Sequence, residues 1–224
     1  MHSNDTSPTV TFFLLLVMVV VVFLFRNKSD PEAKRRKDLG SLARKLHLQF
    51  NLKPDFKLAE EFSFLSWLRR GDVRYAYNVF RGNHMGYPVT FFDYHCTAGK
   101  SRLSYYWSAF VVEMRANFPD IVISHESRES RFAEMLGASH ITFESAEFSR
   151  AFRVRSADKK FAYEVCHPKL MEYLMANQDL TMEISRAGLA LLFEDWLRPE
   201  KIEVNLSRLI EIRKLLPGYL FTKN

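Results

Sequence analysis

Two short stretches of the chain carry side chains that bind phosphate or zinc in other proteins, but neither has the spacing that such sites need. Gly99-Lys100-Ser101 is like the end of a phosphate-binding P-loop, which also requires a glycine at the position of Tyr94. His125-Glu126-Ser127-Arg128-Glu129 begins like the helix of a zinc protease, but Glu129 replaces the second histidine. We therefore interpret these stretches as a turn and a solvated helix start.

Two histidine–cysteine pairs, His95-Cys96 and Cys166-His167, are candidates for a four-ligand zinc site. Neighbouring side chains on a strand point to opposite faces, so His95 and Cys96 cannot both bind one ion without a bulge. Buried thiols and hydrogen-bonded imidazoles explain the same residues. We therefore predict no metal site and no other cofactor.

Paired carboxylates are the remaining candidates for catalysis. Asp93 with Glu113, or Glu194 with Asp195, can supply two carboxylates, but any sheet protein offers such pairs. The chain has no Gly-x-Ser-x-Gly elbow for an acyl-transfer serine. We assign no catalytic residue, and an enzyme with a site assembled from distant residues stays the alternative to a binding module.

An uncharged apolar run occupies residues 10–25. As a helix it is about 24 Å long at about 1.5 Å per residue, so Thr9 and Arg26 have to complete a crossing of the roughly 30 Å hydrocarbon core. A secretory signal has basic residues before its apolar core and a small-residue cleavage site after it, and neither is present. The run therefore predicts an uncleaved transmembrane helix behind a short leader at residues 1–9, with a cleaved signal or a buried core helix as alternatives.

Positive charge follows this run and does not precede it. Residues 1–25 contain no Lys or Arg, whereas residues 26–45 contain eight. The positive-inside bias predicts an extracytoplasmic N-terminus and a cytoplasmic C-terminal domain at the cell inner membrane, and two cysteines fit that reducing compartment. We expect six of these cations to contact anionic lipid head groups: Arg26, Lys28, Lys34, Arg35, Arg36 and Lys37.

The formal net charge of +6 does not indicate nucleic-acid binding. Residues 1–45 carry eight Lys and Arg and four Asp and Glu, which leaves a net charge of only +2 for residues 46–224. A nucleic-acid-binding domain carries its own basic face. The charge distribution therefore predicts a membrane-surface partner and no nucleic acid.

Residues 26–56 predict a basic juxtamembrane amphipathic helix and a linker. Ser29-Asp30-Pro31-Glu32 has the capping side chain and proline of a helix start. Apolar side chains follow at helical spacing: Leu39, Leu42, Ala43, Leu46 and Phe50. We expect this stripe to dock on the domain and the basic half of the helix to contact lipid.

Residues 57–224 predict one α+β domain: an antiparallel β-meander sheet packed with helices. Period-two patterns predict strands at 73–80, 87–96 and 102–115, joined by loops too short for a parallel crossover. Further elements are expected as follows: helices at 58–70, 126–136, 158–175 with a break at 167–168, and 199–216; short strands at 121–123, 140–143 and 152–155; and a hairpin of 180–185 with 189–193.

The meander carries aromatic residues on both faces of its strands. Since a sheet with one wet face alternates apolar and polar residues, this sheet is either covered on both sides or shows aromatic residues to a partner. In the first interpretation the closing helix covers one face, and the helices at 58–70 and 158–175 cover the other. In the second, Tyr94 and Tyr106 form a docking surface for an unknown protein partner.

Four stretches of the domain resemble a family of uncharacterised bacterial membrane-anchored proteins with a domain of unknown function. They lie at residues 78–82, 88–94, 148–154 and 168–171, and the resemblance covers residues 71–195. It implies an anchored domain and no particular activity. With the apolar run, it leads us to expect a single-pass membrane-anchored interaction or scaffold module.

Overall fold

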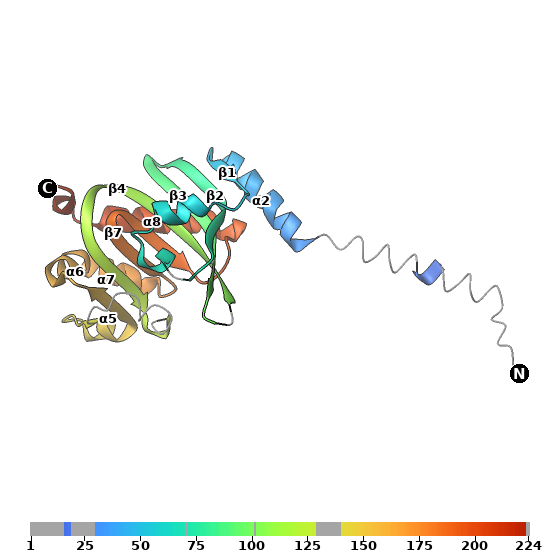
Figure 1. The fold of residues 1–224 in the computed structure, drawn as a ribbon. Helices are drawn as coiled ribbons and strands as arrows, with labels where there is room; N and C mark the ends of the chain where they lie inside the picture. The colour runs from blue at the N-terminus through green and yellow to red at the C-terminus, as the bar shows by residue number, and fades with distance from the viewer. Residues whose placement is uncertain (1–15, 19–29, 70, 101, 129–139, 223–224) are drawn as a thin grey trace, which may run out of the picture. The chain divides into compact units, whose positions relative to one another are not determined.

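The structure, a computed structural model, describes residues 16–18, 30–69, 71–100, 102–128 and 140–222 (Figure 1). The chain divides into two compact units, residues 1–38 and residues 39–224. The predicted transmembrane run lies outside the described residues except for 16–18, which are helical. Within the described ranges, no helix is both long and apolar enough to cross a membrane.

A seven-stranded antiparallel sheet forms the centre of the second unit and confirms the α+β class. Its order is β1-β2-β3-β4-β6-β5, and β7 also pairs with β4. The long strand β4 therefore connects the meander to the second half of the domain (Figure 1). The strands are β1 Gln49–Asn51, β2 Arg74–His84, β3 Tyr87–Ala98, β4 Leu103–His125, β5 His140–Ile141, β6 Phe152–Ser156 and β7 Thr181–Phe193.

Besides the helical residues 16–18, the α-helices have these bounds: α2 Pro31–Lys45, α3 Phe56–Glu61, α5 Ala146–Ala151, α6 Lys159–Val165, α7 Pro168–Ala176 and α8 Pro199–Leu215. Short 3-10 helices are η1 Ser66–Arg69, η2 Glu126–Arg128 and η3 Gly218–Phe221. The closing helix and the helical break at 167–168 agree with the sequence. The single helix expected at 58–70 is instead two short elements, because α3 ends at Glu61 and η1 begins at Ser66.

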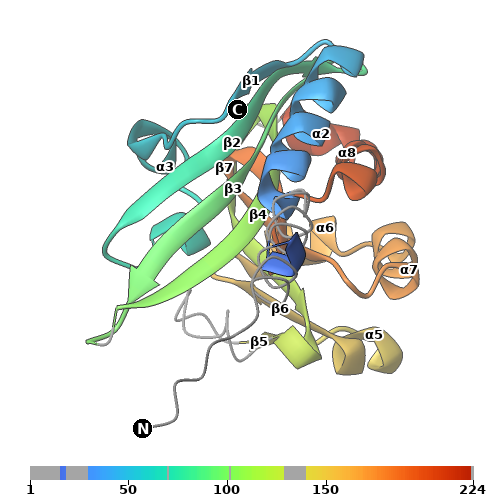
Figure 2. The ribbon, with the colours of Figure 1, turned by 90° about the vertical axis from the view of Figure 1, so that its right-hand side faces the viewer.

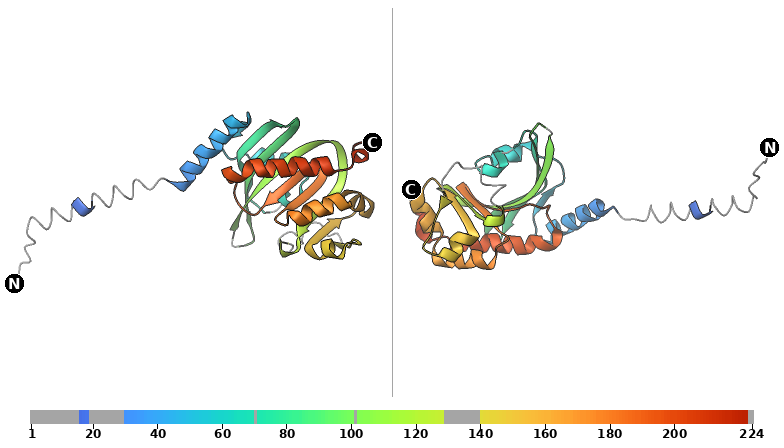
Figure 3. Two further views of the ribbon diagram at one scale, coloured as in Figure 1. Left: turned by 180° about the vertical axis from the view of Figure 1, so that it is seen from behind. Right: turned by 90° about the horizontal axis from the view of Figure 1, so that it is seen from below.

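Helices pack on both faces of the sheet, and the closing helix and the segment at 58–70 lie on opposite faces as expected. One core joins α6, α7, α8 and the C-terminal half of α2 to Phe80, Phe91 and Phe110 of the sheet. The other joins α3 and η1 to Phe92 and Tyr94. The expectation that residues 158–175 lie opposite the closing helix is therefore wrong, since α6 and α7 share the face of α8 (Figure 3).

Two segments expected to be broken by turns are continuous strands. The polar residues before Ile121 include Pro119, yet β4 runs through them, with register shifts against β7 between Glu113 and Ile121. Arg186 of β7 pairs with Phe118 at the same irregularity, so the expected hairpin at 180–193 is also one strand. A proline without an N–H is tolerated at such a bulge because no ladder hydrogen bond is required there.

The region after β4 differs from the sequence interpretation as well. Only Glu126–Arg128 of the expected helix at 126–136 is described, as η2, and residues 129–136 lie outside the described ranges. The strands β5 and β6 pair with each other, and helix α5, which the sequence did not predict, lies between them in the chain. Ser145 caps α5 by accepting a hydrogen bond from the Phe148 N–H at 3.3 Å, which is why the helix starts there.

Candidate interaction surface

The strand register separates the two tyrosines expected to form one docking surface. Tyr94 lies opposite Trp107, and His95 lies opposite Tyr106, across β3 and β4. Directly opposed residues share a face, and neighbours along a strand do not. Tyr94 and Tyr106 therefore lie on opposite faces, and the expected joint surface is corrected on this point.

Tyr94 is a core residue. It is fully buried, and its hydroxyl donates a hydrogen bond to the Leu68 carbonyl at 2.8 Å. Its ring packs on those of Trp67 and Trp107, at centroid distances of 5.4 and 6.2 Å. Burial raises the pKa of the phenol above its ordinary value, so the hydroxyl stays a donor. Tyr94 ties η1 to the sheet and is not available to a partner.

Tyr106 belongs to a row of aromatic rings that reaches solvent. We call this row, which consists of Tyr75, Tyr77, His95, Tyr106 and Trp196, the aromatic face. Centroid distances along it are 5.9 Å for Tyr75–Tyr77, 4.8 Å for Tyr75–His95, 5.0 Å for His95–Tyr106 and 5.7 Å for Tyr106–Trp196. Tyr106 is 42% exposed and Trp196 47% exposed. Three neighbouring strands and the loop before α8 thus bring these rings together.

His95 holds the centre of the aromatic face. Its ring lies between those of Tyr75 and Tyr106, and its Nε2 is 3.2 Å from the Ser104 hydroxyl. Burial lowers the pKa of His95, so the ring is neutral at neutral pH. Burial, followed by the nearby Tyr106, raises the pKa of Tyr75. The face therefore presents apolar rings with hydroxyl tips and no charge of its own.

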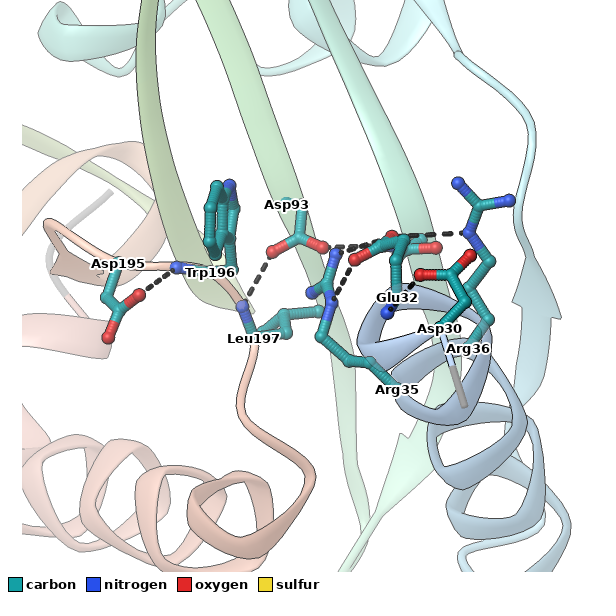
Figure 4. Close-up of polar contacts among 9 residues, drawn as sticks. Asp30, Glu32, Arg35, Arg36, Asp93, Asp195, Trp196 and Leu197 are labelled. Carbon is teal, nitrogen blue, oxygen red and sulfur yellow. Dashed lines mark hydrogen bonds and ion pairs between the residues drawn. The ribbon is translucent and has the colours of Figure 1, made fainter. Parts of the chain in front are cut away.

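A buried carboxylate fixes the loop that carries Trp196. Asp93 accepts a hydrogen bond from the Leu197 N–H at 2.6 Å (Figure 4). It also accepts one from the Asn78 side-chain amide at 2.6 Å. Asn78 has a φ of 48° and lies at a register shift of β2, where its side chain turns toward Asp93. Asp195 accepts from the Trp196 N–H at 2.8 Å. Sequence reasoning weighed Asp93 as a catalytic acid, but the structure shows it as a support for this loop.

A cavity of about 300 Å³ adjoins the aromatic face at Trp196. Phe110 and Phe193 form apolar parts of its wall. Its charged lining residues are Asp179, Asp195, Arg198, Lys201 and Arg208. Arg208 pairs with Asp179 at 2.9 Å and Arg198 pairs with Asp195, whereas Lys201 has no ion pair in the described part of the chain. The cavity can therefore take an apolar side chain that has an acidic group next to it.

The expected lipid-contacting cations fall in the first unit. Arg26 and Lys28 lie outside the described residues. Lys34, Arg35, Arg36 and Lys37 occupy the first turns of α2, where Arg35 and Arg36 both bond Glu32 (Figure 4). The hydrogen bond from Arg35 is the main reason that the pKa of Glu32 is lowered. Contact of these cations with lipid stays a prediction.

The two histidine–cysteine pairs that were weighed as zinc ligands have their cysteines in different cores. Cys96 and Cys166 are both buried and neither belongs to a disulfide, and burial raises the pKa of Cys166. His167 bonds the Leu215 carbonyl through Nε2 at 2.9 Å. Over the described ranges, no group of three His, Cys, Asp or Glu side chains is placed to hold a metal ion.

Glu183 is a buried acidic residue that sequence reasoning missed. It lies on β7, is 1% exposed, and accepts the Ser66 N–H at 2.7 Å through Oε1. Its Oε2 has no hydrogen-bond partner among the described residues. Burial raises the pKa of Glu183 to about 7, and nearby Asp120 acts in the same direction. The available sequence signal was an acidic residue between two apolar residues, Met182 and Ile184, within a predicted strand.

Comparisons with known proteins give a fold and no family. No family model matches the chain, and no curated protein matches it. A solved structure, the crystal structure of the mycobacterial trehalose monomycolate transport factor A, TtfA, is similar with a TM-score of 0.57 and 13% identity. The match covers 81% of this chain and 95% of that one. At this identity the likeness shows a shared fold.

Proposed function

We propose that this chain is a single-pass membrane-anchored interaction module whose domain faces the cytoplasm. The apolar run at residues 10–25 supports the anchor, and the eight Lys and Arg residues after it support the orientation. Six of those cations contact anionic head groups in this proposal: Arg26, Lys28, Lys34, Arg35, Arg36 and Lys37. The same segment keeps the domain close to the membrane.

The aromatic face is the observation that carries the proposal of an interaction module. Tyrosine and tryptophan supply large apolar areas with polar tips, and such residues dominate the energetics of protein interfaces. Here Tyr106 and Trp196 are exposed, but both are held in place. The ring of His95 packs against Tyr106, and Asp93 fixes the loop at 195–197 that carries Trp196. A preformed surface loses little entropy when a partner binds.

The partner in this proposal is a protein of a membrane transport assembly. The similar solved structure is that of a transport factor, and this shared fold is the support for the suggestion. An apolar anchor residue of the partner, next to an acidic group, packs on Trp196 and enters the adjoining cavity near Lys201.

Photocrosslinking in native membranes tests the proposal. The variant pair Tyr106→Ser with Trp196→Ser removes the exposed rings, and Tyr105→Ser is the control because Tyr105 is 41% exposed on the opposite face. We expect the double variant to lose its crosslinked partner at least tenfold with an unchanged melting temperature, while the control keeps it. Equal crosslinking by both variants contradicts the aromatic face as the docking surface.

A membrane-tethered enzyme is the alternative, and Glu183 is the residue that favours it. A buried carboxyl with a pKa near 7 and an unbonded oxygen has the properties of a general base. Ser185, whose hydroxyl donates to the Asp120 carboxylate at 2.6 Å, lies two residues away. However, Glu183 does not line the cavity beside Trp196.

A further inference from the structure

A second candidate binding site is a groove between α5, α6 and α7, which lie together beside β5 and β6 (Figure 2). Its volume is about 740 Å³, and it shares no residue with the aromatic face. Phe148 and Cys166, which are both buried, line it together with the half-buried Met171 and Met175 and the exposed Tyr163. The groove is therefore largely apolar and open to solvent.

Internal contacts hold the walls of this groove in place. The Ser149 hydroxyl accepts the Phe143 N–H at 2.9 Å and donates to the Phe143 carbonyl at 3.1 Å. The Tyr163 hydroxyl donates to the Thr142 carbonyl at 3.1 Å, and the Phe143 ring lies 5.1 Å from that of Tyr163. The wall is thus formed before a ligand binds, which lowers the entropy lost on binding.

Unpaired negative charge surrounds the apolar wall. Glu144, Glu147 and Glu172 line the groove and are exposed. Within the described ranges none of the three has an ion pair or a side-chain hydrogen bond, and no Lys or Arg lines the groove. The basic residues of the same helices, such as Lys160 and Lys169, do not line it either. The groove complements a ligand that is apolar on one side and positively charged at its flanks.

We infer that this groove binds a cationic amphipathic helix of a partner protein. Small-molecule sites place a few convergent polar groups inside an apolar pocket. Here the carboxylates lie on exposed side chains, and the Nε2 of His167 is already used by the Leu215 carbonyl. A helix instead inserts apolar anchors at i, i+3, i+4 and i+7, and methionine walls such as Met171 and Met175 adapt to them.

The test uses the full chain in phosphatidylcholine nanodiscs and a dansyl-labelled 14-residue peptide of Leu and Lys patterned as an amphipathic helix. Fluorescence anisotropy measures binding, with the signal of empty nanodiscs subtracted. The groove variant carries Glu144→Gln, Glu147→Gln and Glu172→Gln. The control carries the same charge change outside the groove: Glu60→Gln, Glu113→Gln and Glu200→Gln. We expect about tenfold weaker binding for the groove variant and less than a twofold change for the control.

A second variant tests the apolar wall. Met171→Gln with Met175→Gln is expected to weaken binding about tenfold even in 0.5 M salt, where exposed charge pairs are screened. Equal losses for the groove and control variants overturn the inference, as does equal binding of a Leu and Glu peptide of the same pattern. The dye anilinonaphthalene sulfonate gives a third outcome. If the dye binds and the Leu and Lys peptide does not displace it, the inference is overturned and the groove is a small-molecule site.

Discussion

Glu183 is the residue whose protonation links this fold to pH. In the unfolded chain its carboxyl has a pKa of about 4.5, and in the folded protein burial raises the pKa to about 7. Between these values the folded protein holds a proton that the unfolded chain has released. The contribution of this proton to the free energy of unfolding is therefore fully present below about pH 4.5 and is lost as the pH rises through 7.

We expect Glu183→Gln to remove this dependence, because the amide stays neutral and can still accept the Ser66 N–H through its oxygen. The variant should match the wild type at pH 5 and exceed it at pH 8 by on the order of 3 kcal/mol. Melting curves of both proteins from pH 5 to pH 8 measure the difference in unfolding free energy. The lowered pKa of His95 does not affect this difference, because both proteins contain His95. Parallel curves would falsify the assignment of the raised pKa.

The tyrosine pair gives a second prediction for single residues. Tyr94→Phe removes a buried hydroxyl and leaves the Leu68 carbonyl without this donor. The expected loss is about 1–2 kcal/mol of unfolding free energy. Tyr106→Phe is the matched control and should change it by less than about 0.5 kcal/mol, since its hydroxyl is on an exposed side chain. Denaturant titration measures both, and equal losses would contradict the separation of the two faces.

At the level of elements, irregularities in the strands decide which residues face which core. Met182 and Ile184 of β7 lie in the same core as Leu189 and Leu191. In a regular strand, even-numbered and odd-numbered residues would point to opposite faces. The same inversion occurs in β4, where Phe110 and Ile121 share that core. Each inversion coincides with the paired irregularity at Phe118 and Arg186, where residue alternation stops for a few positions.

Gly188 allows α3 and η1 to approach β7 at this irregularity. A Cβ on Gly188 would lie 2.6 Å from Cε2 of Phe64, in the segment between α3 and η1. We expect Gly188→Ala to displace that ring and destabilise the protein by about 1–3 kcal/mol. Gly218→Ala is the control because nothing lies within 4 Å of its Cβ position. Thermal melting compares them, and a neutral Gly188→Ala would show that Phe64 moves freely.

For the whole molecule, the basic segment predicts salt-sensitive attachment to lipid. A fragment of residues 26–224 should bind phosphatidylserine vesicles better than phosphatidylcholine vesicles and lose them as salt shortens the Debye length from about 10 Å at 0.1 M. Replacing Lys34, Arg35, Arg36 and Lys37 with Gln should remove the preference. Replacing Lys159, Lys160, Lys169 and Lys201 with Gln should not. Vesicle sedimentation measures both, and equal binding to the two lipids argues against the electrostatic contact.

Orientation in the membrane can be tested on the intact protein. Cys96 and Cys166 are buried, so new thiols at Ser3 and Lys214 are better reporters. In intact cells an impermeant maleimide should label Ser3→Cys and should reach Lys214→Cys only after permeabilisation. The reverse pattern would place the domain outside.

Local sequence determined much of the element list. Proline and acid at a helix start, and glycine at the positive-φ turn of Met85 and Gly86, act within a few residues of chain, so α8 and the turn between β2 and β3 follow from them.

Tertiary structure alone decided which face of the sheet each side chain occupies. The signals at Pro119 and Arg186 predict turns locally, but the strands β4 and β7 pair through them. Beyond such an irregularity, the side chains that pointed to one face of the sheet point to the other. The spacing of residues in the sequence then no longer predicts which side chains are in contact. For the same reason Tyr106 joins His95 and Trp196, whereas Tyr94 is buried beneath η1.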